Sequence, residues 1–353
     1  MQVARAYSIQ DVRLEEAAIP AIGPGEALLR VEACGLCTSD CLDWYVAKKA
    51  PIVLGHEPAG TLVGVGREVR AFAEGQRVFT HHHVPCGACP DCRRGADTSC
   101  RLFKETALDP GGFAHYLRIP AANLAADTLA LPEAMSWELA TWIEPLACSL
   151  RVFAKARPLA PGASVLVIGL GAMGLLNAMA ARAKGAGRLI GSDPVAVRRA
   201  KALELGFDAC VDPALENLPD QVRAVNGGAL ADLVIVGPGY GPAIEQGLTC
   251  AAPNGTVVLF SPSPPALTVP LNPGALYFAE ISLTASYSCG PRETREALDL
   301  LERGVIDPSP LVTMRTGLEG VGEAIRRTVA RGADLKAVVF PHHSLVHDAK
   351  VER

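Results

Sequence analysis

The sequence predicts an α/β protein that combines a β-rich domain with a second domain built on a doubly wound parallel sheet. In the first 120 residues, short apolar runs are separated by turn dipeptides such as Pro24-Gly25 and Glu74-Gly75. From Pro161 onward, short apolar strands alternate with helical segments, and a glycine-rich turn follows the first of these strands. This alternation indicates βαβ units, which form a parallel sheet.

The expected elements follow from these patterns. The β-rich part has expected strands at Ala27–Val31, Thr61–Val65 and Arg77–Thr80. In the parallel sheet, the expected strands are Ser164–Ile168, Arg188–Ser192, Leu233–Gly237, Thr256–Phe260 and Ile281–Ser286, with helices at Ala172–Lys184 and Val195–Leu205. Two further helices, Glu293–Arg303 and Leu318–Arg331, precede a final strand at Lys336–Phe340, which we expect to return to the first domain.

Composition excludes several classes of protein. The chain has 353 residues, of which 49% are hydrophobic and 20% charged, so it can bury a large core. Its net charge of -4 does not attract a polyanion, so we expect no nucleic-acid partner. The N-terminus has no apolar signal region, and the apolar stretch Val165–Ala181 is too short for a membrane span. We therefore expect a cytoplasmic protein whose 11 cysteines are free or metal-bound.

A dinucleotide fingerprint follows the strand Ser164–Ile168. It consists of Gly169, Leu170, Gly171, Ala172, Met173 and Gly174, which match GxGxxG. The first two glycines allow a tight turn and a close approach to a pyrophosphate, and the third packs the helix against the strand. The N–H groups at the start of the following helix suit the phosphates.

An acidic residue follows at the distance that this motif requires. Asp193 ends the next strand, nineteen residues after Gly174. A carboxylate there accepts hydrogen bonds from ribose hydroxyls and repels a 2′-phosphate, which predicts NAD rather than NADP. Arg198, one turn into the next helix, is a candidate to cover the adenine, and a solvated helix face is an equal alternative.

Four cysteines predict a closed metal site. Cys86, Cys89, Cys92 and Cys100 lie within fifteen residues, and four thiolates can enclose one tetrahedral structural zinc. Close spacing disfavours disulfides, and an iron–sulfur cluster is the other alternative. Three histidines, His81 to His83, precede this segment, and we interpret them as a solvated strand end with some metal affinity.

A second, open metal site is indicated upstream. Cys37 lies in a Cys-Gly-x-Cys segment, His56 follows in Gly-His-Glu, and Glu144 precedes a proline. One thiolate, one imidazole and one carboxylate leave a fourth position of a zinc ion for substrate. Long separations leave alternatives open: His56 as a turn histidine, or Cys34, Cys41 or Cys148 as the metal thiolate.

With both zinc motifs and the glycine motif, the chain resembles the medium-chain zinc-dependent alcohol dehydrogenases along nearly its whole length. Glu144, with its following proline, is similar to the polyol (sorbitol-like) and threonine dehydrogenase branch. The resemblance implies a GroES-like catalytic domain (residues 1–147 and 287–353) with a structural-zinc lobe at about 85–101. It also implies a Rossmann NAD-binding domain over residues 148–286.

The resemblance also assigns roles. It implies that Cys37, His56 and Glu144 hold the catalytic zinc, with Glu57 beside it as an occasional fourth ligand or through water. Ser39 would pass on the substrate proton, and Asp40 would orient the ring of His56. Many relatives carry a histidine where this chain has Leu42, so the onward route of the proton is left open.

The expected function is hydride transfer between a secondary alcohol, of a polyol or sugar derivative, and NAD, with two zinc ions per chain. L-Threonine 3-dehydrogenase and sugar-phosphate polyol dehydrogenase activities are the alternatives within this chemistry. A non-enzymatic NAD- or metal-sensing protein and a zinc-free quinone or enoyl reductase are the alternatives outside it. The resemblance to the family implies a homotetramer or a homodimer. We expect the protein to bind a small-molecule substrate, and we expect no membrane or nucleic-acid partner.

Overall fold

The computed structural model describes residues 1–215 and 217–343. The chain divides into two compact units, one formed by Met1–Glu144 with the residues from Gly290 onward, the other by Pro145–Cys289. The boundaries expected from the sequence, 147/148 and 286/287, lie within a few residues of this division. No helix in the described part of the chain is long and apolar enough to cross a membrane.

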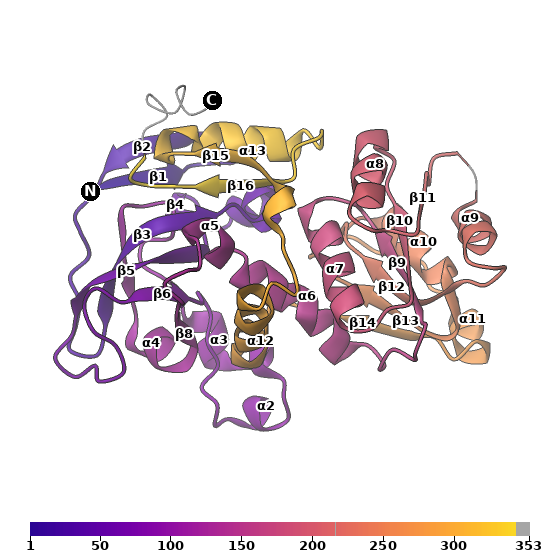
Figure 1. Ribbon diagram of the computed structural model, residues 1–353, viewed down its shortest axis with the longest axis horizontal. Coiled ribbons are helices and arrows are strands. Elements are labelled where there is room, and N and C mark those ends of the chain that lie inside the picture. Colours follow the sequence, from indigo (N-terminus) through magenta and orange to yellow (C-terminus); the bar gives the residue numbers. More distant parts are fainter. Residues whose placement is uncertain (216, 344–353) are drawn as a thin grey trace. The chain divides into compact units, whose positions relative to one another are not determined.

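The first unit is built around a seven-stranded sheet with the order β15-β16-β3-β5-β6-β8, in which β7 also pairs with β3. A second sheet has the order β2-β1-β4. The strands are β1 (Gln2–Ala6), β2 (Val12–Glu16), β3 (Ala27–Gly35), β4 (Ile52–Val53), β5 (Glu57–Val65), β6 (Arg77–Thr80), β7 (Tyr116–Ile119), β8 (Thr128–Ala130), β15 (Val312–Thr316) and β16 (Lys336–Val339). The C-terminal strand β16 returns to the first unit, as expected, and pairs there with β3 (Figure 1).

Short helices connect these strands. They are η1 (Thr38–Cys41), α1 (Asp43–Val46), α2 (Pro90–Arg93), η2 (Asp97–Ser99), α3 (Arg101–Glu105), α4 (Ala121–Asp127), α5 (Trp137–Ala140), α12 (Pro291–Glu302), η3 (Ser309–Leu311), η4 (Leu318–Gly320) and α13 (Val321–Val329). Helix α6 (Ile143–Lys155) begins at the end of the first segment of this unit.

The antiparallel pair β3 and β5 positions the residues of the open metal site. Along β3, Ala27, Leu29 and Val31 are buried and alternate with less buried neighbours, as a strand with one face on a core requires. The register places Gly35, at the end of β3, opposite Glu57, at the start of β5. A Cβ atom on Gly35 would lie 1.9 Å from Glu57 Oε2, so only glycine fits beside this carboxylate.

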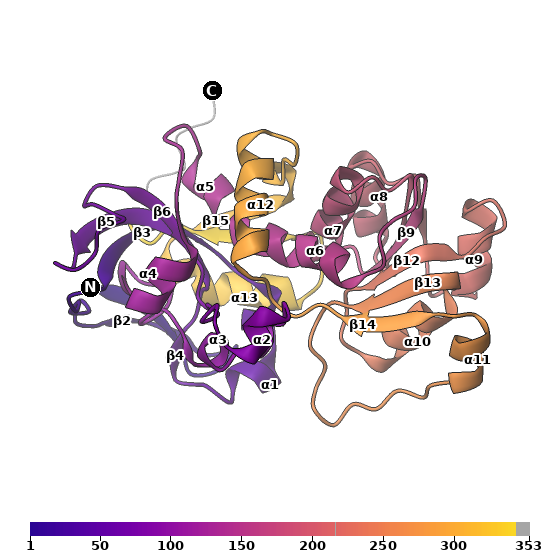
Figure 2. The ribbon, with the colours of Figure 1, turned by 90° about the horizontal axis from the view of Figure 1, so that it is seen from below.

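The second unit contains the expected parallel sheet, with the order β11-β10-β9-β12-β13-β14. Its strands are β9 (Ser164–Ile168), β10 (Arg188–Ser192), β11 (Ala209–Val211), β12 (Ala231–Val236), β13 (Ala251–Leu259) and β14 (Ser282–Ala285). Its helices are α7 (Ala172–Ala183), α8 (Ala196–Glu204), α9 (Leu218–Val225), α10 (Gly241–Thr249) and α11 (Pro273–Phe278). Figure 2 shows α7 and α8 on one side of the sheet and α10 on the other, which confirms the doubly wound arrangement.

Candidate active site and metal centres

Cys37, His56 and Glu57 form a compact group in the first unit, with potential ligand atoms all within 4.8 Å of one another. Cys37 lies two residues after the end of β3 and directly before η1, while Glu57 is the first residue of β5. Gly55 has a φ of 89°, and this left-handed turn brings His56 to the group. A thiolate, an imidazole and a carboxylate are the ligand types that zinc takes in sites with an open position.

Asp40 and Ser39, both in η1, support this group. Asp40 Oδ1 lies 3.4 Å from His56 Nδ1, which leaves Nε2 of that ring for a metal. Burial opposes a charge on His56, yet Asp40 and Cys37 together raise the pKa of His56 well above its ordinary value. The Ser39 hydroxyl donates a hydrogen bond to Cys37 Sγ at 3.3 Å, so Ser39 lies beside the predicted ligand.

Glu57 is held by a lysine that the sequence did not single out. Lys336 Nζ, from β16, lies 2.5 Å from Glu57 Oε2, and both side chains are buried. Burial raises the pKa of Glu57 and Lys336 opposes that rise, while Glu57 raises the pKa of Lys336 against the effect of burial. Glu57 Oε1 is buried and has no hydrogen-bond partner among the described residues. Such an atom suits a bound cation.

Glu144 lies in a second group of potential ligands. It is buried in the first turn of α6, and its carboxylate offers an atom within 4.8 Å of those of His81 and His82. The ring centroids of His82 and His56 are 4.7 Å apart, so the two groups are neighbours. Glu144 remains a predicted zinc ligand, whereas Glu57 is the carboxylate that shares the compact group with Cys37.

The interpretation of the histidine run as a solvated strand end is wrong for His81. Its side chain is fully buried, and its Nδ1 lies 3.0 Å from Asp127 Oδ2. The other oxygen of Asp127 accepts a hydrogen bond from the Thr294 hydroxyl at 2.6 Å. Asp127 and Thr294 lie far from His81 in the sequence, so the pattern of residues around His81 gave no signal of this burial.

The four-cysteine lobe has the geometry of a closed metal site. The sulfur atoms of Cys86, Cys89, Cys92 and Cys100 lie within 4.8 Å of one another, and all four cysteines are free of disulfides. The backbone N–H groups of Ala88 and Cys89 lower the pKa of Cys86 to about 6. That shift favours the thiolate form, which binds zinc.

The glycine motif has the conformation that dinucleotide binding requires. Gly169 has a φ of 89°, and a Cβ on Gly174 would lie 1.8 Å from the Gly169 carbonyl oxygen, so the first and third glycines cannot be replaced freely. Helix α7 begins at Ala172 and continues through Met173. Its first N–H groups are therefore available to phosphate oxygens.

Asp193 lies directly beside this loop. Its Oδ2 accepts a hydrogen bond from the Leu170 N–H at 2.8 Å and its Oδ1 accepts one from Val195 N–H at 2.8 Å. Arg198 Nη1 lies 4.0 Å from Asp193 Oδ2. The carboxylate therefore stabilises the glycine loop, and each of its oxygens keeps a further lone pair for a ribose hydroxyl.

Comparisons with known proteins agree with this arrangement. The model of the alcohol dehydrogenase GroES-like domain matches residues 23–132, and that of the zinc-binding dehydrogenases matches residues 172–303. The L-threonine 3-dehydrogenase of Pyrococcus horikoshii is 32% identical over 93% of this chain and 94% of its own. The sorbitol dehydrogenase of Rattus norvegicus is 31% identical over 93% of this chain and 92% of its own.

A solved structure shows the same fold with a cofactor present. An alcohol dehydrogenase of Escherichia coli CFT073, complexed with NADH, is 25% identical and superposes with a TM-score of 0.85. The alignment covers 96% of this chain and 99% of that one.

Proposed function

This chain belongs to the medium-chain zinc-dependent alcohol dehydrogenases, and from that premise we propose that it oxidises a secondary alcohol of a polyol or sugar derivative with NAD. One observation carries the proposal: Glu57 lies in a compact group with Cys37 and His56, and its buried Oε1 has no hydrogen-bond partner among the described residues. These three ligand types fit a zinc ion with one position left for the hydroxyl oxygen of the substrate.

Several residues of the chain have distinct roles at this site. When bound, zinc would polarise the substrate hydroxyl and lower its pKa, and NAD would accept the hydride. Ser39, next to Cys37, relays the hydroxyl proton: its oxygen accepts that proton as the serine passes its own proton on to water. Asp40 holds the ring of His56, and Lys336 holds Glu57 Oε2, while Glu57 Oε1 has no hydrogen-bond partner among the described residues.

The substrate class rests on the relatives. Sorbitol dehydrogenase and L-threonine 3-dehydrogenase both appear among them at similar identity, so L-threonine is the alternative substrate. Sorbitol and L-threonine each carry a second polar group on a carbon next to an alcohol carbon. The proposal therefore extends to secondary alcohols with such a neighbour, and polyols are the first choice.

Metal analysis combined with a substrate screen tests this proposal. We expect two zinc ions per chain and NADH formation from a polyol. Cys37→Ser removes one zinc and the activity, whereas the control Cys210→Ser, which alters a thiol in the second unit outside both metal groups, keeps both. A fully metallated protein that forms no NADH from polyols, sugar phosphates or L-threonine contradicts the proposal.

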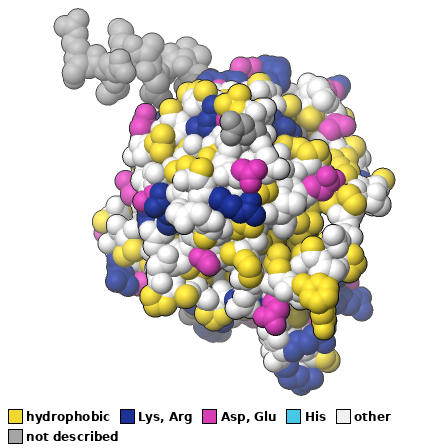
Figure 3. Space-filling view, turned by 90° about the vertical axis from the view of Figure 1, so that its right-hand side faces the viewer, with side chains coloured by type: hydrophobic (Ala, Val, Ile, Leu, Met, Phe, Trp, Pro, Cys, Tyr) yellow, Lys and Arg dark blue, Asp and Glu magenta, His cyan; other side chains and the backbone are white. Residues whose placement is uncertain are grey.

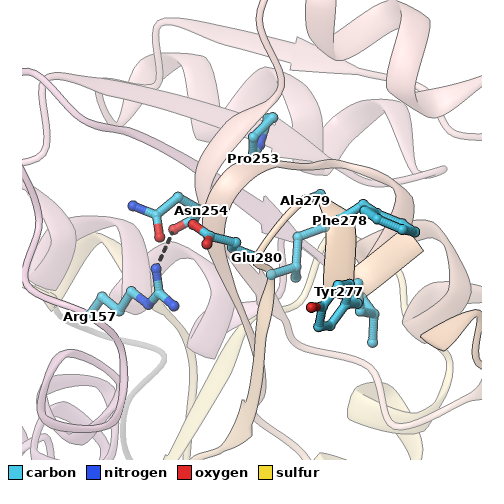
Figure 4. Close-up of a pocket in the computed structure, with 9 residues that line it drawn as sticks. Arg157, Pro253, Asn254, Tyr277, Phe278, Ala279 and Glu280 are labelled. Atoms are coloured by element: carbon cyan, nitrogen blue, oxygen red, sulfur yellow. Dashed lines mark hydrogen bonds between the residues drawn. The ribbon is translucent and has the colours of Figure 1, made fainter. Parts of the chain in front are cut away.

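Self-association is the second part of the proposal. In the described part of the second unit, β14 is the last strand of its sheet, and it follows α11, whose Tyr277 and Phe278 are 77% and 87% exposed. The two rings meet edge to face, with centroids 5.2 Å apart. Arg157 and Glu280 line the same pocket, where Arg157 Nη1 donates a hydrogen bond to the Asn254 carbonyl oxygen at 3.2 Å (Figure 4). Hydrophobic side chains also gather on the lower part of the face in Figure 3. Exposed aromatic surface next to a sheet edge suits a second copy of the chain.

Light scattering tests the oligomeric state. We expect a mass of two or four chains, and a smaller mass for the double variant Tyr277→Ser/Phe278→Ser. The control Leu203→Ser alters a half-exposed leucine on α8 and leaves the mass unchanged. A monomeric wild-type protein contradicts this part.

A further inference from the structure

Of the three consecutive histidines His81, His82 and His83, His82 is the one whose Nδ1 has no hydrogen-bond partner among the described residues. His81 Nδ1 lies 3.0 Å from Asp127, and His83 Nδ1 lies 2.6 Å from the Thr106 carbonyl oxygen. His82 Nδ1 is buried, but it has no hydrogen-bond partner within residues 1–215 and 217–343. A buried nitrogen without a partner costs free energy, which a ligand can recover.

The position of His82 is fixed beside the proposed zinc site. Its ring centroid lies 4.7 Å from that of His56, and it offers a ligand-type atom within 4.8 Å of one on Glu144. The buried Asn123 amide donates to the carbonyl oxygens of His81 and His82 at 2.8 and 3.0 Å. The backbone that carries this ring is therefore held in place while the ring nitrogen stays open.

The ring suits a neutral contact next to a cation. A neutral imidazole offers one N–H donor and one acceptor, and a bound metal does not repel it.

We propose that His82 is a specificity residue that hydrogen-bonds the hydroxyl or amino group on the carbon next to the reacting carbinol. This inference rests on the proposed function, because it places the reacting oxygen on a metal at Cys37 and His56, with the carboxylates of Glu57 and Glu144 beside it. A vicinal diol or a β-hydroxy amino acid forms a hydrogen bond with His82 Nδ1, whereas a simple secondary alcohol leaves this nitrogen without a hydrogen bond. Sites built to pair a substrate group reject analogues that lack it.

Turnover of matched substrates tests the inference. The substrates are 2,3-butanediol, L-threonine and 2-butanol, which differ in the group beside the carbinol. We expect kcat/KM for one of the first two to exceed that for 2-butanol, and His82→Phe to reduce this ratio roughly 10- to 100-fold. The rate with 2-butanol should stay close to that of the wild type.

Two further variants separate specificity from structural damage. His82→Asn places an amide near the position of Nδ1 and should restore part of the ratio. His115→Phe removes a histidine whose ring stacks on that of His342, with centroids 4.6 Å apart. This variant should leave the ratio of kcat/KM values unchanged. An unaltered ratio in His82→Phe overturns the inference, and so does an equal loss with all three substrates.

Calorimetry distinguishes failure of this inference from failure of the proposed function. If the zinc-loaded wild type oxidises no secondary alcohol, the proposed function fails. Binding of 2,3-butanediol and 2-butanol to the zinc- and NADH-loaded protein then still decides the role of His82, because equal affinity in wild type and His82→Phe overturns it. A third bound zinc that is lost in His82→Phe would make this residue a metal ligand, which also overturns the inference.

Discussion

Lys336 Nζ lies 2.5 Å from Glu57 Oε2, although 279 positions separate the two residues in the chain. The Lys336 ammonium also lies 5.2 Å from the centroid of the Trp142 ring, which adds a cation–π contact. Because both charges are buried, neither has water as an alternative partner. The pair therefore joins the last strand, β16, to the first residue of β5 at the proposed zinc site.

Loss of this lysine should destabilise the protein. Lys336→Met leaves the buried Glu57 without a counter-charge, and we expect a loss of about 3–5 kcal/mol in the free energy of unfolding. The double variant Lys336→Met/Glu57→Gln should lose less, because no uncompensated charge remains. Urea unfolding followed by circular dichroism measures all three proteins. Wild-type stability in the single variant would show that the pair contributes nothing.

The zinc content of variants distinguishes the roles of Glu57 and Glu144. Glu144→Ala should lose one of two zinc ions and the dehydrogenase activity, while NAD binding persists because the glycine motif is untouched. Glu138→Ala, which alters a carboxylate paired with Arg315 near the surface, is the control and should keep both ions. Loss of zinc in Glu57→Ala but not in Glu144→Ala would transfer the ligand role to Glu57.

Asp193 should determine the choice of cofactor. Asp193→Ser removes the charge that repels a 2′-phosphate, so the ratio of kcat/KM for NADP to that for NAD should rise by roughly tenfold or more. The same change removes the acceptors for the N–H groups of Leu170 and Val195, so affinity for both cofactors should also fall. A cofactor ratio equal to that of the wild type argues against the role of Asp193.

His83 should make stability depend on pH. Burial lowers the pKa of His83 to about 4, whereas in the unfolded chain it titrates near its ordinary value of 6.5. Between these values the unfolded state binds more protons, so stability is complete above about pH 6.5 and falls as the pH drops toward 4. His83→Phe should reduce the loss of stability between pH 7 and pH 5.

Denaturant unfolding at both pH values measures this effect. Comparison of the variant with the wild type at each pH cancels the titration of the other groups that the two proteins share. Equal pH dependence in the two proteins would exclude His83 as its source.

Local patterns in the sequence were sufficient for the architecture of the second unit. The alternation of apolar strands with helices predicted five of the six strands of the described parallel sheet, together with helices α7 and α8. Strand β11 and helices α9, α10 and α11 were not predicted. The four cysteines were equally informative, because fifteen residues cannot move far apart. In each case the residues that cooperate are close in the chain, so their spacing limits their geometry.

The open metal site shows where such patterns become insufficient. Cys37, His56 and Glu57 were candidates from the sequence, and the register of β3 with β5 brings them together. The sequence did not show which carboxylate lies inside this group. Glu57 lies inside it, whereas Glu144 lies beside His81 and His82, and this arrangement depends on where α6 begins relative to β6. The resemblance to a family suggested the residues but not this arrangement.

The sequence by itself determined the alternation of strands and helices in the second unit, the closed cysteine site and the dinucleotide loop, since each depends on neighbours along the chain. Only the tertiary structure decided that Lys336 pairs with Glu57, that Asp127 contacts the buried His81, and that His82 Nδ1 has no hydrogen-bond partner among the described residues. These contacts join segments that are remote in sequence. Their existence depends on strand register and side-chain packing, and no local pattern of residues encodes either of them.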